Sequence, residues 1–220
     1  MGIFQKTAVL LGAVLLSCGV TGFANAAVVT YSFTGVVDSI GSSLSGAPVV
    51  VGDALSGSFS YETTTAVDGP GNPAAYNALT NVHFTVGGYS AFSTDPRSIF
   101  IGNDPANDFF SVRTSAAQGL TGPPINGTEL AFFQLSLSDP TSSVFSDLSL
   151  PAFLNFASFG GGKNFIVAFN GDVSPHAILG HLTDVSVAET PLPAALPLFA
   201  SVLGAIGFFA HRRKRKAAVA

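Results

Sequence analysis

An alternation of apolar and polar residues with a period of two runs through the middle of this chain. Leu55, Phe59 and Tyr61 alternate with serines at 56, 58 and 60, and residues 29–37 follow the same rule. Successive side chains of a β-strand point to opposite faces, so this pattern predicts strands with one buried face. No stretch between residues 27 and 189 has a helical period of 3.6 residues. The pattern therefore predicts an all-β body.

Clusters of turn-forming residues cut the alternation into about nine short segments. Further candidate strands are 79–92, 97–102, 108–114, 128–139, 163–172 and 179–189. The separating clusters, rich in Gly, Pro, Asn and Asp, are 68–73, 103–108, 119–127, 138–143 and 159–163. Short strands at such spacing predict an antiparallel β-sandwich or a jelly-roll-like body.

The charges are strongly segregated along the chain. Between residues 27 and 189 three basic residues, Arg97, Arg113 and Lys163, stand against thirteen acidic ones, a net charge of −10. A surface of this sign repels nucleic acid, so we expect no nucleic-acid partner. The only cysteine, Cys18, precedes the body, which must then be held together by core packing without disulfides.

Residues 1–26 have the three parts of a secretory signal peptide. Lys6 supplies the positive charge, and residues 7–16 form an apolar stretch too short to span a bilayer. Ala24 and Ala26 place small side chains at the −3 and −1 positions, which predicts cleavage before Ala27. We therefore expect an N-terminal signal helix, handled by Sec-type export machinery and signal peptidase.

A second interpretation of this segment stays open. Leu15-Leu16-Ser17-Cys18 resembles the lipobox of bacterial lipoproteins, in which the cysteine is lipidated after cleavage. The mass of the mature N-terminus distinguishes Ala27 from an acylated Cys18.

The C-terminus predicts a membrane anchor. Residues 192–210 contain no charge, and as a helix they would be about 28 Å long, close to the hydrocarbon thickness of a bilayer. A basic tail at 211–216 follows, with the cations Arg212, Arg213, Lys214, Arg215 and Lys216. Positive residues stay on the cytoplasmic side, so a transmembrane helix here would leave the acidic body on the outer side.

The entry to this helix resembles a known sorting signal. Pro191-Leu192-Pro193-Ala194, followed by the apolar segment and the basic tail, is similar to the C-terminal signal of PEP-CTERM sorting domain-containing proteins, in its V-P-L-P-A variant. Thr190 stands where Val is typical. The resemblance assigns 190–194 to the motif, 190–220 to the whole signal, and 27–189 to an extracytoplasmic β-sandwich domain.

The resemblance implies that the anchor is temporary. An exosortase, a membrane-embedded cysteine protease-transpeptidase, is the enzyme expected to recognise the motif and release or transfer the body. Prolines suit such a motif because they keep the backbone extended and unpaired. The expected precursor lies in the inner membrane of a Gram-negative bacterium with its body in the periplasm. The product would be at the cell surface or extracellular, with exopolysaccharide as an implied partner.

One loop has ligands suited to calcium. Asn103, Asp104, Asn107 and Asp108 are rich in side-chain oxygens. The loop lacks the ligand order of an EF-hand, and Pro105 is typical of a plain turn. We predict no metal or cofactor and keep this loop as a weak calcium candidate.

The histidines give no recognised catalytic or zinc motif. His176 and His181 are five residues apart, which does not match the helical zinc-binding pair. The chain has no G-x-S-x-G nucleophile motif. His83 beside a Ser and an Asp, or a pair of facing carboxylates, would instead indicate a secreted hydrolase such as a glycoside hydrolase.

These features predict a non-enzymatic, exported cell-surface or matrix protein of unknown binding activity. Two alternatives stay open: a carbohydrate-binding or adhesin module of the biofilm matrix, and a secreted hydrolase. For the first, the absence of Trp leaves few aromatic residues to stack on sugars, with Tyr76 and Tyr89 as the candidates.

Overall fold

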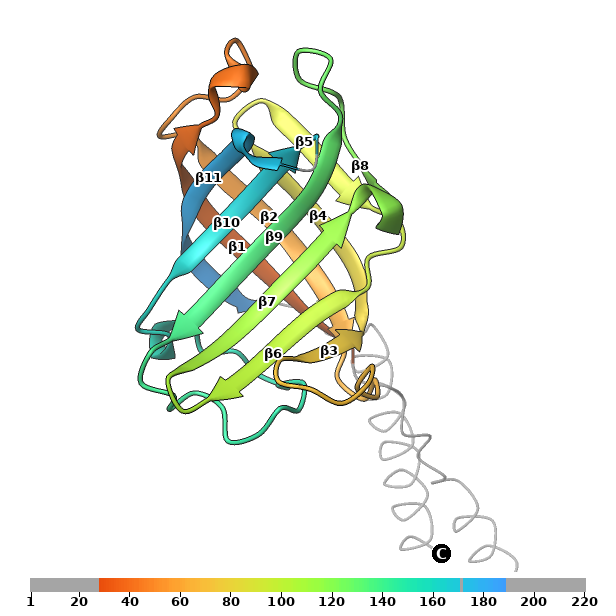
Figure 1. Ribbon diagram of the computed structural model, residues 1–220, viewed down its shortest axis with the longest axis vertical. Coiled ribbons are helices and arrows are strands. Elements are labelled where there is room, and N and C mark those ends of the chain that lie inside the picture. The colour runs from red at the N-terminus through yellow and green to blue at the C-terminus, as the bar shows by residue number, and fades with distance from the viewer. Residues whose placement is uncertain (1–27, 171, 189–220) are drawn as a thin grey trace, which may run out of the picture. The chain divides into compact units, whose positions relative to one another are not determined.

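The computed structural model describes residues 28–170 and 172–188, whose strands form one antiparallel sheet (Figure 1). The strand order is β3-β6-β7-β9-β10-β11-β1-β2-β4-β5-β8. The strands are β1 (Val28–Ile40), β2 (Ala54–Glu62), β3 (Ala74–Asn77), β4 (Leu79–Val86), β5 (Tyr89–Ser93), β6 (Ser98–Asp104), β7 (Asn107–Ser115), β8 (Leu120–Thr121), β9 (Leu130–Asp139), β10 (Lys163–Phe169) and β11 (Asp172–Val187). The 3₁₀ helices are η1 (Ser42–Leu44), η2 (Ala116–Gln118) and η3 (Phe156–Ser158).

The predicted antiparallel all-β class is confirmed. The segment 79–92 is divided into β4 and β5 by a hairpin turn at Gly87-Gly88, where Gly87 has a φ of 54° that favours glycine. β3 and β8 were not predicted, because four and two residues are too few for a visible alternation. The facing strands belong to one curled sheet, and the jelly-roll-like arrangement stays a prediction.

Several predictions concern residues outside the described part of the chain. They are the signal peptide with Ala24, Ala26 and Ala27, the candidate lipid site Cys18, the sorting motif 190–194, the apolar segment 192–210, and the basic tail. Within residues 28–170 and 172–188, no helix has the length and apolar character needed to cross a membrane.

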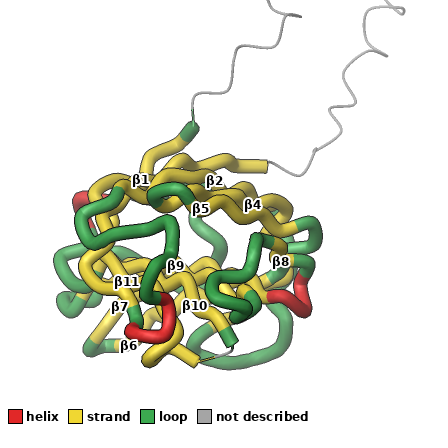
Figure 2. The backbone as a smooth tube through the Cα atoms, turned by 90° about the horizontal axis from the view of Figure 1, so that it is seen from above, coloured by secondary structure: helices red, strands yellow, loops and turns green. Residues whose placement is uncertain are grey.

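The sheet curls around a core rich in aromatic side chains. In the view of Figure 2, β1, β2, β4 and β5 lie on one side of the interior, across from β6, β7 and β10. Rings from the two sides meet inside: Phe84 of β4 stacks on Phe133 of β9 with 4.4 Å between centroids, and Phe59 of β2 lies 6.1 Å from Phe110 of β7. All four rings are buried. The predicted alternation thus places one face of each of these strands in a common core.

The long connection from β9 to β10, residues 140–162, covers one end of this core (Figure 1). Three tyrosines of the sheet hold it. The Tyr31 hydroxyl accepts a hydrogen bond from the Leu154 amide at 2.9 Å, and the hydroxyls of Tyr61 and Tyr76 each donate to a backbone carbonyl of the loop at 2.6 Å. Burial raises the pKa of Tyr61 above its ordinary value, so its phenol stays a neutral donor.

Candidate binding sites

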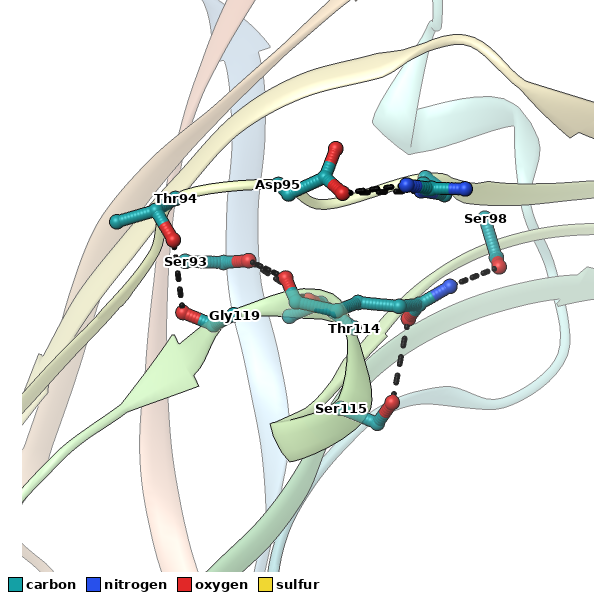
Figure 3. Close-up of polar contacts among 9 residues, drawn as sticks. Ser93, Thr94, Asp95, Ser98, Thr114, Ser115 and Gly119 are labelled. Atoms are coloured by element: carbon teal, nitrogen blue, oxygen red, sulfur yellow. Dashed lines mark hydrogen bonds and ion pairs between the residues drawn. The ribbon is translucent and has the colours of Figure 1, made fainter.

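A polar cluster near η2 closes the curl of the sheet (Figure 3). The Thr114 hydroxyl of β7 donates to Ser93 Oγ of β5 at 3.0 Å, and Ser93 donates to the Gln118 carbonyl at 2.8 Å. Gln118 Nε2 donates in turn to Ser98 Oγ of β6. In the strand order, β5 lies near one edge of the sheet and β6 and β7 near the other. These bonds therefore join the two edges, and we assign the cluster a structural role.

The calcium candidate loop does not converge on one point. Asn103, Asp104 and Asn107 lie at the tip of the β6–β7 hairpin, where the Asp104 carboxylate accepts from the Ala106 amide. Asp108 instead lies among the buried side chains of the interior. Among the residues that the structure describes, no group of three or more His, Cys, Asp or Glu side chains is placed to hold a metal ion.

Asp108 and Asp139 are buried carboxylates that the sequence pattern does not reveal as a pair. They face each other across β7 and β9 in the sheet register. Asp108 Oδ2 accepts from the amides of Val144 and Phe145, at 2.9 and 2.8 Å, and Asp139 accepts from the amide and hydroxyl of Ser143. Both carboxylates thus fasten the start of the β9–β10 connection to the sheet.

The hydrogen bonds of the Ser143 amide and the Thr141 hydroxyl lower the pKa of Asp139 from 3.8 to about 2. Asp108 Oδ1 is buried and has no hydrogen-bond partner in the described part of the protein. The pair acts as a loop anchor rather than as two carboxylates facing each other across an open cleft.

The histidines lie apart from one another. His83 Nδ1 is 2.9 Å from Ser58 Oγ, and His181 Nδ1 is 2.8 Å from Asp38 Oδ1; all four side chains lie on the outer face of the sheet. The Ser58–His83 pair thus meets part of the arrangement expected of a hydrolase. Within residues 28–170 and 172–188, no carboxylate contacts His83.

Tyr76 and Tyr89 are not available as a surface for sugars. Their side chains are 7% and 1% exposed, because both lie among the core residues on the inner face of the sheet. The accessible aromatic residues are phenylalanines instead. Phe92 of β5, which is 51% exposed, is one of them. It lines a depression of about 550 Å³ together with His83, Thr85, Ser90, Thr121 and Pro123.

A second depression, the outer groove, crosses β6, β7 and β9 on the face opposite to the core. Its volume is about 330 Å³, near the lower end of the range for small-molecule sites. The residues that define it are Phe100, Phe109, Ser111, Arg113, Gln134 and Ser136. The three adjacent strands thus contribute aromatic rings, a guanidinium, an amide and hydroxyls to one groove.

The fold and these depressions define an antiparallel all-β domain with two candidate binding grooves on its outer face. Comparison with protein-family models, with curated proteins and with solved structures gives no match.

Proposed function

We propose that this chain is an exported bacterial protein, processed at its C-terminal sorting signal and delivered to the cell surface or the extracellular matrix. The observation that carries this is the order of three features: the motif Pro191-Leu192-Pro193-Ala194, the uncharged segment 192–210 and the basic tail. A bare membrane anchor needs only the last two. The proline motif is the added element, and it favours processing over permanent anchoring.

The position of the motif supports the proposal. The last strand, β11, ends at Val187, and the motif begins three residues later at Thr190. A protease acting there would cut beyond the last hydrogen bonds of the sheet. The cut would thus release the body without breaking a strand.

The proposed route has three steps. Sec-type machinery exports the chain, signal peptidase cuts before Ala27, and the C-terminal helix holds the precursor in the inner membrane with its body in the periplasm. An exosortase-like enzyme then cuts at residues 190–194. The two flanking helices and the jelly-roll-like arrangement of the body are parts of this proposal.

The experiment is a mass measurement of the protein isolated from its native host. We expect a C-terminus near residues 190–194, without the cations 212–216. Replacing both Pro191 and Pro193 with Ala should retain the tail and keep the protein in the membrane fraction. Pro197→Ala, beyond the motif, is the matched control and should be processed normally. A wild-type protein that keeps Arg212 to Lys216 at steady state would refute processing and establish simple anchoring.

A carbohydrate-binding body is the second candidate function. The outer groove favours it, because an aromatic surface beside hydrogen-bonding groups matches the two chemistries of a sugar ring. The hydrolase alternative has weaker support, since the Ser58–His83 pair lacks a carboxylate contact in the described part of the chain and has no orienting group.

A further inference from the structure

Arg113 differs from Arg97 in having no carboxylate partner among the described residues, and it shares with Lys163 a position over an aromatic ring. Arg97 is paired with Asp95 at 2.6 Å, and Lys163 Nζ lies 4.2 Å from the ring centre of Phe156 in the β9–β10 connection. The Arg113 guanidinium stacks on Phe132, 4.5 Å from the ring centre, and has no carboxylate partner among the described residues. A cation–π contact of this kind places the guanidinium over the ring without using its N–H donors in a hydrogen bond.

Arg113 supplies the only charge among the residues that line the outer groove. None of the residues that line the outer groove is acidic. On the strands that the groove crosses, Asp108 and Asp139 are buried on the inner face and Asp104 is exposed at the far end of β6. Beside Ser98, the residue opposite Arg113, Asp95 is already paired with Arg97 and Asp68 with the amide of Asn77. The groove is therefore a locally positive site on a domain that is otherwise acidic.

Phe109 supplies an apolar surface in the same groove. It lies opposite Gly102 in the sheet register. A Cβ atom added at Gly102 would come within 2.2 Å of the Phe109 ring, so the ring packs directly against the β6 backbone. Such a ring is held in place by the sheet and is only partly buried. Phe100, opposite Ser111, extends the apolar surface toward Arg113.

Polar groups border the aromatic surface. Gln134 lies opposite Arg113 in the register, and its Nε2 donates to Ser136 Oγ at 2.9 Å. This bond orients the amide, and Gln134 Oε1 accepts no hydrogen bond from the part of the chain that the structure describes. Phe109 and Arg113 are four residues apart on one strand, so their Cα atoms are about 13 Å apart. This distance exceeds the width of one sugar ring.

We propose that the outer groove binds a glycan segment of at least two sugars that includes a uronic acid. The apolar C–H face of one ring stacks on Phe109 and Phe100. The carboxylate of the neighbouring uronic acid pairs with the Arg113 guanidinium, and a sugar hydroxyl donates to Gln134 Oε1. The inference rests on the second candidate function and is independent of C-terminal processing.

The test is calorimetric titration of the full chain, purified in a mild detergent, at 150 mM NaCl. The acidic probe is a trisaccharide of mannuronic acid, and the neutral probe is cellotriose. We expect the acidic probe to bind at least tenfold more tightly. Arg113→Gln should remove this preference, Arg113→Lys should keep part of it, and Phe109→Ala should weaken both probes. Arg97→Gln, which changes an ion-paired arginine outside the groove, is the control and should bind like the wild type.

Three outcomes would overturn the inference. If both probes bind equally and Arg113→Gln has no effect, the groove is a neutral-glycan site; the second candidate function then survives without the uronic acid. If neither probe binds a protein with a normal unfolding transition, the groove is not a glycan site. If Arg97→Gln weakens binding as much as Arg113→Gln does, the effect is one of overall charge. None of these results bears on the processing of the C-terminus.

Discussion

The two faces of β7 and β9 contain similar residues and use them differently. On the inner face Phe110 and Phe133 are fully buried, and their rings contact other aromatic rings of the core. On the outer face Phe109 is only partly buried, and Arg113 is exposed. Aromatic content alone therefore does not tell whether a ring is buried in the core or accessible on the surface. The adjacent rings of Phe109 and Phe110 point to opposite faces and differ in burial, while Phe132 on the outer face of β9 is buried beneath Arg113.

Truncating one ring on each face should change the stability of the protein by very different amounts. Phe133→Ala removes a ring stacked on both Phe33 and Phe84, and we expect the free energy of unfolding to fall by about 3–5 kcal/mol. Phe109→Ala on the outer face should cost only about 1 kcal/mol. Urea denaturation of the two variants measures both values. Equal losses would show that the outer ring is also a core residue.

We expect a smaller loss of stability from removing a hydroxyl that holds the β9–β10 connection to the sheet. Tyr31→Phe leaves the buried Leu154 amide without its acceptor, which should lower the free energy of unfolding by about 1–3 kcal/mol. Limited proteolysis should then cut more rapidly within residues 140–162. Tyr76→Phe, which leaves a carbonyl rather than an amide unpaired, should be milder. Unchanged cleavage in the Tyr31 variant would mean that packing alone holds the loop.

The smallest expected change is that of Thr141→Val, which alters how stability depends on pH at the Asp139 anchor. The native pKa of Asp139 is about 2 and its ordinary value is 3.8, so between these values the unfolded state binds more protons than the native state. This stabilisation is therefore complete above about pH 4 and is lost as the pH falls through about 2. Thr141→Val removes one hydrogen-bond donor and should move the loss toward higher pH. Unfolding midpoints measured from pH 5 to pH 2 check the shift; coincident curves would contradict it.

The longer strands could be predicted because their alternation is local, whereas the short strands β3 and β8 could not. Residues 108–114 correspond closely to β7, and 128–139 to β9. The order of the strands could not be predicted, since pairings such as β7 with β9 and β1 with β11 join distant segments. The closing cluster at Ser93 and Thr114 depends on that order, and ordinary serines and threonines do not reveal it.

The candidate site could not be predicted from the sequence, because it also depends on which strands are neighbours. The outer groove combines Phe109 and Arg113 with Gln134 from another strand, and only the register brings them together. In the sequence, the alternation of Phe109, Ser111 and Arg113 indicates that these three side chains share one face of a strand. Because Phe109 and Phe110 are adjacent and both apolar, the alternation does not show which of the two faces is buried. Tyr76 and Tyr89 were proposed as sugar contacts because tyrosine is common at such sites. Both side chains are buried, so residue type alone, without the strand register, did not identify the aromatic side chains on the surface.

The pairing of β1 with β11 has a consequence for biogenesis. Tyr31 of the first strand lies opposite Val187 of the last, and together these strands join β2 to β10. A chain made from its N-terminus cannot complete the sheet until residue 187 has emerged. Until then β1 and β10 each present an unpaired edge, the kind of surface on which strands of other chains assemble. The nascent protein should therefore depend on chaperones that shield these edges until its last strand is made.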